Sequence, residues 1–565
     1  FIFLSAFEFK EFSQSLVSVI AFLSNIFFYI KIDYFSLAAE EMPLLHTWSL
    51  AIEEQFYIIF PPLLYVIWKF GQKYLLAALV LLSVVSFTTV IFLNHIGDPS
   101  ASFYWPVSRA WELLAGSICA LFTYNNTRKD RKYLSDLGLL ILIACMFIWS
   151  SSYSHPGYLT IIPILATCLV ILFPNDKSVS FKVLSNQTLV FVGLISYSLY
   201  LWHQPIFAFL RIKSMGHPDI LQIALALILT FVTAYLSYRY VETPFRNKVK
   251  FNRKFIFATS SGLLALFLSI GLFGHVTNGF DKRYVFLPSY AESMKHSPMR
   301  KKCHASHYNY LAPDDSCRYF EEDVTWAVFG DSHTVEPAYA LANVLKERSV
   351  GVVHHSYSNC PPALNYQLKG NELCSKWLND TLVSLEENDH IENVLLGFRY
   401  SAAIFGDNAP IFPAIPEKVV LNIDSSHNLT EQKKLAIYWQ SLEEIIVRLL
   451  EANKRVILLE PIPELPMHIG RAVSAFSIYG KSTLLDLKTS TTKEYYERRH
   501  KFILEKLRGL KDQENLVLIN SYELLCHENG CPAVIGDTAM YFDDDHLSID
   551  GSKILFERLQ LTTTL

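Results

Sequence analysis

Thr325-Trp-Ala-Val-Phe-Gly-Asp-Ser-His333 sets the architecture of the C-terminal half of this chain. The apolar run 325–329 predicts a buried strand, and the Gly-Asp-Ser that follows predicts a sharp turn into a helix near 334–348. This turn places Ser332 at the carboxyl end of the strand, and we expect its hydroxyl to be exposed near the helix N-terminus. Backbone N–H groups there can stabilise an oxyanion. A serine hydroxyl is a weak nucleophile by itself, so Ser332 also needs a base.

Short apolar runs alternate with longer amphipathic runs through the rest of this half. Further strands are predicted at 350–354, 393–398, 455–460 and 515–520, and further helices at 431–453, 493–510 and 550–559. This alternation favours an α/β domain with a parallel sheet, in which active sites lie at the carboxyl ends of the strands. We expect this domain to cover residues 325–565 and residues 276–324 to be a linker or extension.

The candidate base lies near the end of the chain, in Tyr541-Phe-Asp-Asp-Asp-His-Leu-Ser-Ile-Asp-Gly551. Asp543 and His546 are three residues apart and fit on one loop, so that His546 acts on Ser332 while Asp543 holds the working tautomer. Each motif alone is weak, because Gly-Asp-Ser is more often a plain turn and the aspartate run also suits a solvated loop or a calcium site. The pair, at the two ends of one α/β domain, is more specific. We predict no resident metal.

Long apolar runs fill residues 1–275, whereas charged residues are spread through the second half. A membrane helix needs about 20 mostly apolar residues. Nine candidate helices are predicted, at 13–31, 48–68, 74–94, 110–124, 134–151, 158–174, 188–210, 220–240 and 255–275. The chain begins at Phe1 inside an apolar run that lacks a charged n-region and a cleavage site. We therefore expect no signal peptide, and a natural N-terminus that lies upstream.

The nine cysteines divide between the two halves. Three lie inside apolar runs, where cysteine is a small buried hydrophobe: Cys119, Cys145 and Cys168. The other six fall into close pairs in the second half: Cys303 and Cys317, Cys360 and Cys374, Cys526 and Cys531. Six cysteines allow fifteen connectivities, of which local pairing is the simplest. An even set without Cys-x-x-Cys doublets favours disulfides over zinc, and hence an oxidising compartment for this half.

Basic residues between the predicted helices indicate the orientation of the chain in its membrane. If the C-terminal half faces outward, the inner loops hold 13 basic residues: Lys69, Lys73, Arg128, Lys129, Arg131, Lys132, Lys177, Lys182, Arg246, Lys248, Lys250, Arg253 and Lys254. The outer loops then hold 4: Lys31, Arg109, Arg211 and Lys213. This asymmetry agrees with the cysteine argument, which rests on different residues. The net charge of −4 gives no sign of nucleic-acid binding.

Polar residues at the ends of three apolar runs are candidates for a site in the membrane half. They are His46, Trp48, Ser49, Glu53 and Glu54 in the first run, Arg109 and Glu112 in the second, and His203 in the third. Carboxylates near a membrane helix are costly unless they face a partner or a polar cavity. The alternative is that these residues lie at helix ends, in water or among lipid headgroups, where Trp and His are plain interfacial anchors.

Four segments of the first half resemble acyltransferase family 3 membrane proteins. They are His46-Thr-Trp-Ser-Leu-Ala-Ile-Glu-Glu-Gln-Phe-Tyr57, Arg109-Ala-Trp-Glu-Leu-Leu-Ala-Gly116, Ile195-Ser-Tyr-Ser-Leu-Tyr-Leu-Trp-His203 and Val241-Glu-Thr-Pro-Phe-Arg246. The resemblance implies a helical membrane domain over residues 1–275 that handles acyl groups. The family also has further N-terminal helices with an essential His and an Arg-rich segment. Neither can be assigned in this chain, which we expect to lack them.

The Gly-Asp-Ser and Asp-x-x-His motifs together resemble the SGNH (GDSL-like) hydrolases. This resemblance implies a triad in which Ser332 is the nucleophile, Asp543 the orienting acid and His546 the base. The family's Gly-x-Asn-Asp block, which supplies an oxyanion-hole Asn, has its nearest equivalent at Leu396-Gly-Phe-Arg-Tyr400, which has no Asn. The remaining oxyanion candidates are Arg399 and the backbone N–H of Ser332.

A chain with a family 3 membrane half followed by an SGNH half resembles bacterial O-acetyltransferases of surface glycans. This resemblance implies a multi-pass protein of the bacterial inner membrane with a periplasmic C-terminal domain. The implied donor is acetyl-CoA, with no permanently bound cofactor. The implied acceptor is a surface glycan such as lipopolysaccharide O-antigen, or a lipid-linked oligosaccharide, in a cleft that segments 355–430 and 461–492 can shape. The alternatives are an esterase that removes acetyl groups with the same triad, and a glycan-binding or assembly protein without catalysis.

Overall fold

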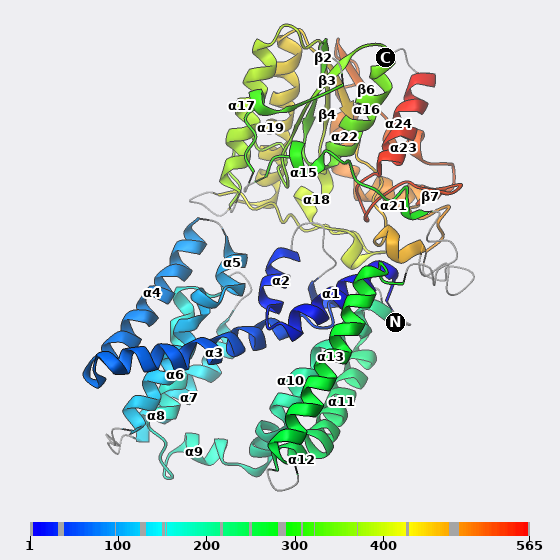
Figure 1. The fold of residues 1–565 in the computed structure, drawn as a ribbon. Coiled ribbons are helices and arrows are strands. Elements are labelled where there is room, and N and C mark those ends of the chain that lie inside the picture. The colour runs from blue at the N-terminus through cyan, green and yellow to red at the C-terminus, as the bar shows by residue number, and fades with distance from the viewer. Residues whose placement is uncertain are drawn as a thin grey trace. The chain divides into compact units, whose positions relative to one another are not determined.

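The structure is a computed structural model that describes residues 4–31, 39–96, 98–124, 132–149, 153, 155–214, 218–247, 251–280, 290–306, 309–320, 323–369, 371–424, 429–473 and 485–562. The chain divides into two compact units (Figure 1). Residues 9–214 and 218–279 belong to a helical unit. Residues 280–562, together with residues 4–8, belong to an α/β unit.

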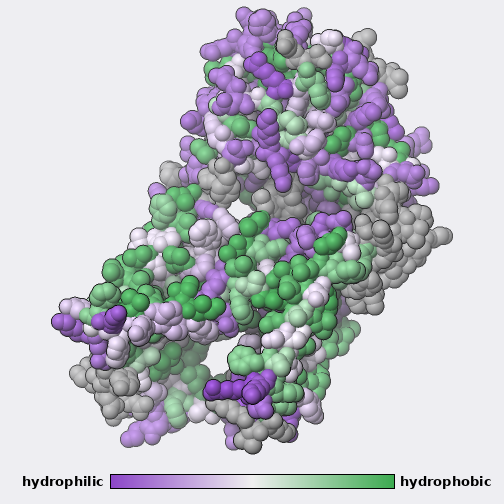
Figure 2. All heavy atoms as spheres, in the orientation of Figure 1, coloured by the Kyte–Doolittle hydropathy of each residue, from purple (hydrophilic) through white to green (hydrophobic). Residues whose placement is uncertain are grey.

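The helical unit consists of helices joined by short connections. Its α-helices are α1 (Ala6–Ile20), α2 (Ser24–Lys31), α3 (Thr47–Phe70), α4 (Leu75–His95), α5 (Pro99–Tyr104), α6 (Pro106–Tyr124), α7 (Lys132–Ile148), α8 (Ile161–Leu172), α9 (Val179–Leu184), α10 (Gln187–Lys213), α11 (Ile220–Ser237), α12 (Thr243–Arg246) and α13 (Arg253–Val276). Among the described residues, five helical spans are long and apolar enough to cross a membrane: 47–70, 72–95, 187–213, 220–246 and 253–276. Figure 2 shows hydrophobic residues over much of the surface of this unit and mainly hydrophilic residues over the α/β unit.

Each of the nine predicted membrane helices overlaps a helix of the structure, but the first prediction is wrong in its extent. Residues 13–31 do not form one helix, because α1 ends at Ile20 and α2 begins at Ser24. Phe22 between them has a left-handed backbone with φ of 55°, which interrupts an α-helix. The polar side chains that follow bond to other parts of the unit: Ser24 donates to the carbonyl of Thr47 at 2.9 Å. The apolar pattern alone carries no sign of this break.

The α/β unit is built on a six-stranded sheet. Its strands are β1 (Cys317–Tyr319), β2 (Val324–Gly330), β3 (Gly351–Ser356), β4 (Asn393–Gly397), β5 (Arg455–Leu459) and β6 (Leu516–Ile519), with β7 (Val534–Ile535) and β8 (Thr538–Ala539) as a separate hairpin. The sheet order is β1-β3-β2-β4-β5-β6, in which only β1 is antiparallel to its neighbour. The strand order reverses between β2 and β4. A ligand crevice is therefore expected at the carboxyl ends of these two strands.

Helices cover both faces of this sheet (Figure 1). They are α15 (Arg300–Cys303), α16 (Val335–Lys346), α17 (Glu372–Glu387), α18 (Tyr400–Phe405), α19 (Glu431–Glu451), α21 (Lys493–Arg499), α22 (Lys501–Arg508), α23 (Ser521–Leu525) and α24 (Ile549–Thr562). Alternate residues of β2 pack against the helices on opposite faces of the sheet. Val328 packs in the cluster that contains α16 and α24, whereas Phe329 packs in the cluster of α17 and α19, with its ring 5.7 Å from that of Trp377. The strand is apolar throughout because both of its faces are buried.

Most elements of the α/β unit agree with the sequence-based prediction. All five predicted strands are present, as are the helices predicted near 334–348, 431–453 and 550–559. The predicted helix 493–510 is divided into α21 and α22 at His500. Several elements were not predicted: the short elements α15, α18, α23, β7 and β8, and also α17 and β1. Helix α17 lies in segment 355–430, where the sequence predicts no helix, and β1 lies within the predicted linker 276–324, where it pairs with β3.

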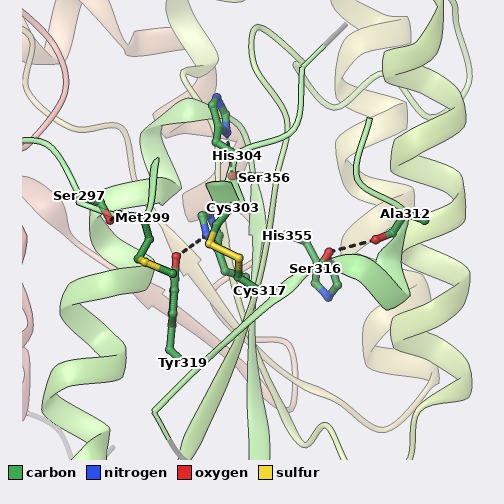
Figure 3. The surroundings of a disulfide bond; sticks show 11 residues. Ser297, Met299, Cys303, His304, Ala312, Ser316, Cys317, Tyr319, His355 and Ser356 are labelled. Carbon is green, nitrogen blue, oxygen red and sulfur yellow. Dashed lines mark hydrogen bonds between the residues drawn. A yellow bond between two sulfur atoms is a disulfide. The ribbon is translucent and has the colours of Figure 1, made fainter. Parts of the chain in front are cut away.

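The three predicted disulfides are present in the structure. They join Cys303 to Cys317, Cys360 to Cys374 and Cys526 to Cys531. The first ties α15 to β1 (Figure 3). Two histidines in its surroundings bond to serines: His304 Nδ1 lies 2.8 Å from Ser356 Oγ, and His355 Nδ1 lies 2.8 Å from Ser316 Oγ. The segment that leads into the sheet is therefore cross-linked to β1 by a covalent bond and fastened to β3 by side-chain hydrogen bonds.

Candidate active site

Beyond the carboxyl end of β2, His546 lies within hydrogen-bond distance of both Ser332 and Asp543. His546 Nε2 is 2.9 Å from Ser332 Oγ, and His546 Nδ1 is 2.8 Å from Asp543 Oδ2. An imidazole that donates from Nδ1 to a carboxylate can accept a proton from a hydroxyl at Nε2. The structure thus brings together the three residues that the sequence predicts as a catalytic triad.

The turn that carries the nucleophile, residues 331–334, is held by β2 and β4. A side chain at Gly330 would collide with the carbonyl oxygen of Gly397, so glycine is required for the two strands to end so close together. Asp331 Oδ1 accepts the backbone N–H of His333 at 2.9 Å, and Asp331 Oδ2 accepts the backbone N–H of Arg399 at 2.7 Å. Asp331 thereby fixes the turn and ties it to the segment after β4.

The histidine loop, residues 541–547, positions the base by its own hydrogen bonds. Asp543 Oδ1 accepts the backbone N–H groups of Asp545 at 3.0 Å and of His546 at 2.7 Å. The other Asp543 oxygen is then free to meet the imidazole of the same loop. The spacing Asp-x-x-His therefore specifies this local geometry directly, which is why the sequence alone identified it.

The Ser332 hydroxyl is buried, and the expectation that it is exposed is wrong for this structure. Ser332 is 0% exposed and His546 is 1% exposed. His333 packs beside them, with Nδ1 3.5 Å from Ser332 Oγ and its ring centroid 4.0 Å from that of His546. The backbone turn alone would leave the hydroxyl exposed, and it is the side chains packed around the turn that bury it.

Burial and charge act in opposite directions on the ionisable groups of the site. Burial alone would lower the pKa of His546, but the Asp543 and Asp545 carboxylates outweigh it and raise this pKa to about 10. Burial would raise the pKa of Asp545, but Arg399 and His546 hold it well below its usual range. Burial, together with the nearby His546 charge, holds the pKa of His333 well below its usual range. At neutral pH the site therefore holds an imidazolium at His546 and a neutral imidazole at His333.

Arg300 joins the parts of the site, and sequence reasoning missed it. Its Nη2 donates to the carbonyl of Ser332 at 3.1 Å, and its Nε and Nη2 donate to Glu336 on α16 at 2.9 and 2.5 Å. Its guanidinium also lies 5.1 Å from the ring centroid of Phe542, which stacks on His546. No motif marks Arg300, which stands in the predicted linker beside two exposed lysines. Only the folded chain distinguishes it from them.

The Arg399 side chain is directed at carboxylates. Its guanidinium forms ion pairs with Asp545 and with Asp407, the latter at 2.7 Å. The roles of Arg399 and of the Ser332 N–H at an oxyanion therefore stay predictions. Among the described residues, two groups of three side chains here could hold a metal ion, since the ligand atoms within each group fall within 4.8 Å of one another: His333 with Asp545 and His546, and Asp543 with Asp544 and Asp545. Asp545 and His546 are, however, already engaged in the ion pairs described above.

In the helical unit, three of the predicted candidates meet around Tyr200 on α10. Ser49 Oγ lies 2.5 Å from Tyr200 Oη, which donates to the carbonyl of His46. His203 Nδ1 lies 2.6 Å from the Tyr200 carbonyl, and the His46 and His203 rings are 5.4 Å apart. Tyr200 was not among the predicted candidates, because a tyrosine in an apolar helix has no distinctive spacing.

The other membrane candidates lie farther along or beside α3. Arg109 pairs with Glu112 at 2.9 Å, and its guanidinium lies 5.4 Å from the ring of Trp48. Glu53 is partly buried and Glu54 is exposed, both beyond Trp48 on the same helix. The structure thus places Trp48 with Arg109, and His46 and Ser49 with His203. The functional roles of these eight residues stay predictions.

A serine after the first parallel strand, with an Asp-x-x-His loop before the last helix, defines an SGNH-type domain. Comparison with known families agrees: residues 302–560 match the SGNH domain that is fused to AT3 domains, and residues 2–239 match the acyltransferase domain of family 3. The chain therefore carries an acyltransferase domain of family 3, followed by an SGNH domain of the kind that is fused to such domains. The five helices among the described residues that are long and apolar enough to cross a membrane agree with a multi-pass membrane protein.

Individual relatives cover only part of the chain. The O-acetyltransferase OatA of Staphylococcus aureus, from strains NCTC 8325 and COL, is 32% identical over 254 residues, which are 42% of this chain and 42% of OatA. The chain thus aligns with less than half the length of the curated relatives it matches. A solved structure, the periplasmic domain of a Salmonella ser. Paratyphi A lipopolysaccharide acetyltransferase, is 20% identical with a TM-score of 0.34. It covers 46% of this chain and 90% of that domain.

Proposed function

We propose that this protein is an O-acyltransferase that transfers an acyl group, acetyl in the first instance, to a hydroxyl of a surface glycan. The observation that carries the proposal is the Ser332–His546–Asp543 relay in an SGNH domain that follows an acyltransferase domain. The name O-acetyltransferase of the relatives supports the reaction class. The proposed acceptor is lipopolysaccharide O-antigen, a similar surface polysaccharide or a lipid-linked oligosaccharide. The proposed donor is acetyl-CoA, and no permanently bound cofactor takes part.

In the first half-reaction Ser332 becomes acylated. Neutral His546 takes the hydroxyl proton at Nε2 while Ser332 Oγ forms a bond to the acyl carbonyl carbon. The bond between that carbon and the acyl carrier then breaks, and the proton passes from His546 to the carrier. Because Ser332 is buried, substrate entry requires a side chain to move. We assign this movement to His333, whose Nδ1 lies 3.5 Å from the hydroxyl.

In the second half-reaction a glycan hydroxyl takes the place of the carrier. His546 accepts the proton of the sugar hydroxyl as the sugar oxygen attacks the ester carbonyl, and the bond to Ser332 Oγ breaks as Oγ regains a proton. A bound sugar hydroxyl outcompetes water because its effective concentration is far higher. The segments proposed to shape this cleft, 355–430 and 461–492, are described except for residues 370, 425–428 and 474–484.

The membrane half has a separate task in this proposal. Acyl-CoA is a cytoplasmic donor, whereas the disulfide-bonded α/β unit fits an oxidising compartment. The helical unit would accept the acyl group on the cytoplasmic side of a bacterial inner membrane and pass it outward. The SGNH domain would then complete the transfer in the periplasm.

The test is mass spectrometry of surface polysaccharide from cells that express the full-length protein, as wild type, Ser332→Ala or Ser375→Ala. Ser375 on α17 is a matched control whose hydroxyl donates to the Leu364 carbonyl. We expect acetylation with the wild type and with Ser375→Ala, and its loss with Ser332→Ala. Equal acetylation in all three would refute the proposed role of Ser332. Lower acetylation with the wild type than without it would instead identify an esterase, since the same triad can hydrolyse an ester.

A further inference from the structure

His546 Nδ1 faces two carboxylates, although a catalytic triad needs one. Asp543 Oδ2 lies 2.8 Å from this nitrogen and Asp545 Oδ1 lies 2.6 Å from it. The two acids differ in their other contacts. The second oxygen of Asp543 accepts hydrogen bonds from backbone N–H groups of its own loop. Asp545 instead forms an ion pair with the guanidinium of Arg399, which lies outside the loop. The second carboxylate is therefore supported from a different part of the fold.

Arg399 provides that support. Its backbone N–H donates to Asp331 on the nucleophile turn at 2.7 Å, while its guanidinium pairs with Asp545 on the histidine loop. A single residue after β4 thus contacts both segments that carry the reacting groups. Two carboxylates at one ring nitrogen repel each other, and one of them becomes protonated unless a cation offsets the charge. Arg399 supplies that cation, and the side chain is only 11% exposed.

We propose that Asp545, held by Arg399, is a second positioning carboxylate for His546, and that Arg399 serves this pair and not the oxyanion. The inference rests on the proposed function, in which His546 is the base. Its chemical benefit lies in the acceptor. A sugar hydroxyl is a weak acid, and the imidazolium that forms when His546 takes its proton is stabilised by two carboxylates. The cost is that more of the free enzyme holds His546 protonated at neutral pH.

This arrangement gives the protein a characteristic dependence on pH. The titratable and charged groups around His546 are Asp543 and Asp545 on its own loop, Asp331 and His333 on the nucleophile turn, Arg399 after β4, and Arg300 and His304 on the segment of α15. Of these, the two loop carboxylates are those that raise the pKa of His546. Asp545→Asn removes one negative charge and keeps the shape of the side chain. The neutral, basic form of His546 is then reached at a lower pH.

The experiment measures the rate at which a fluorophosphonate probe labels Ser332 in the purified full chain, from about pH 6 to about pH 11. It compares wild type with Asp545→Asn, with Asp544→Asn as the matched control on the same loop, and with Ser332→Ala as background. We expect Asp545→Asn to label to the same final extent, with the midpoint of its pH profile lower by about one unit or more. Asp544→Asn should keep the wild-type midpoint. The final extent of labelling shows that each variant is folded.

Arg399→Gln separates the two roles that Arg399 can have. If Arg399 acts through Asp545, then Asp545→Asn and Arg399→Gln are not additive in the double variant. If it stabilised the oxyanion, Arg399→Gln would slow labelling equally at every pH, alone and combined with Asp545→Asn, which would overturn its assignment here. A profile of Asp545→Asn that superimposes on wild type would overturn the second carboxylate while leaving the proposed function intact. Wild-type labelling no faster than that of Ser332→Ala would sink the proposed function itself.

Discussion

At the scale of single residues, the buried ion pair between Arg300 and Glu336 is expected to hold the nucleophile turn in place. Both side chains are buried, and Arg300 also donates to the carbonyl of Ser332. Arg300→Met leaves the buried Glu336 carboxylate without its cation, although the Ser297 N–H still donates to it at 3.0 Å, and this loss should cost about 3–5 kcal/mol in the free energy of unfolding. Chemical denaturation of the purified chain measures this cost. Lys301→Met, at the exposed neighbouring position, is the control and should change it by less than about 0.5 kcal/mol.

The double variant Arg300→Met with Glu336→Met extends this prediction. Removing both charges leaves no unpaired buried ion, so most of the lost stability should return. Fluorophosphonate labelling of Ser332 should be slower than in the wild type in both the single and the double variant, because both lack the contact from Arg300 to the Ser332 carbonyl. A double variant that labels as fast as wild type would show that Arg300 matters for stability alone.

The pKa of His546 also makes a prediction about stability. It is raised from 6.5 to about 10 in the folded chain, so the protonated form is stabilised by folding. That contribution is fully present below about pH 6.5 and is lost as the pH rises through about 10. Asp543→Asn weakens it. The gap in unfolding free energy between wild type and Asp543→Asn should therefore be wide at neutral pH and shrink towards pH 10. A gap that does not vary with pH would contradict this account.

The sequence was informative about residues whose geometry is local. Asp543 and His546 lie on one loop, and Ser332 lies on a turn that its own motif encodes, so these three could be identified from spacing. Asp543, Asp544 and Asp545 are chemically identical in the sequence, and only the folded loop shows which of them face the imidazole. Contacts with distant segments give three further residues their places in these sites: Arg300, His333 and Tyr200. No local sequence pattern predicts such contacts.

At the scale of elements, the Cys303–Cys317 disulfide fastens α15, and with it Arg300, to the edge of the sheet. It closes a loop with a sequence separation of 14, and loss of such a cross-link costs about 3 kcal/mol through the entropy of the unfolded chain. The double variant Cys303→Ser with Cys317→Ser should lose about this much in denaturant unfolding. The pair Cys526–Cys531 has a separation of only 5 and should cost about 1 kcal/mol less when removed in the same way.

Labelling of Ser332 distinguishes the two cross-links in a second way. Only the first is joined to a helix that contacts the nucleophile turn, so its loss should slow labelling more than loss of Cys526–Cys531 does. Equal effects on labelling would mean that α15 keeps its position without the covalent bond.

Elements were predictable where both faces of a strand are buried. Strands β2, β4, β5 and β6 are mainly apolar runs, as is typical of a parallel sheet covered by helices, whereas β3 begins with apolar residues and ends in His354-His-Ser356. Helix α17 was missed although Leu378, Leu382 and Leu385 are buried at helical spacing, because its remaining positions are largely polar and give a weak periodic signal. The β1 strand is three residues long and forms only through pairing with β3. Such a strand is specified by tertiary contacts and not by its own sequence.

At the scale of the whole molecule, composition alone separated the two halves. The apolar runs of the first half and the paired cysteines of the second were visible without any structure, and they correspond to the helical and α/β units. The number of membrane crossings was harder to predict. Helices α7 and α8 have 17 and 12 residues, shorter than an ordinary membrane span of about 20. Hydropathy therefore predicts that these helices exist but does not determine whether each of them crosses the membrane.

The orientation of the chain can be tested with a matched pair of introduced cysteines. After replacement of Cys119, Cys145 and Cys168 by alanine, Ser214→Cys lies in a predicted outer loop and Asn126→Cys in a predicted inner one. A membrane-impermeant maleimide, applied to spheroplasts, should label Ser214→Cys directly and Asn126→Cys only after permeabilisation. The reason is the excess of basic residues in the inner loops, which sets orientation during insertion.

The reverse pattern of labelling would have a specific consequence. It would place the α/β unit in the cytoplasm, where thiols are kept reduced and the three disulfides of that unit would not persist. It would also remove the need for an acyl group to cross the membrane, since acyl-CoA and the Ser332 site would then share one compartment. The same measurement therefore tests the topology and the division of labour between the two units. The predicted topology and the proposed division of labour both require the α/β unit and the acyl donor to lie on opposite sides of the bilayer, so a reversed orientation would contradict both.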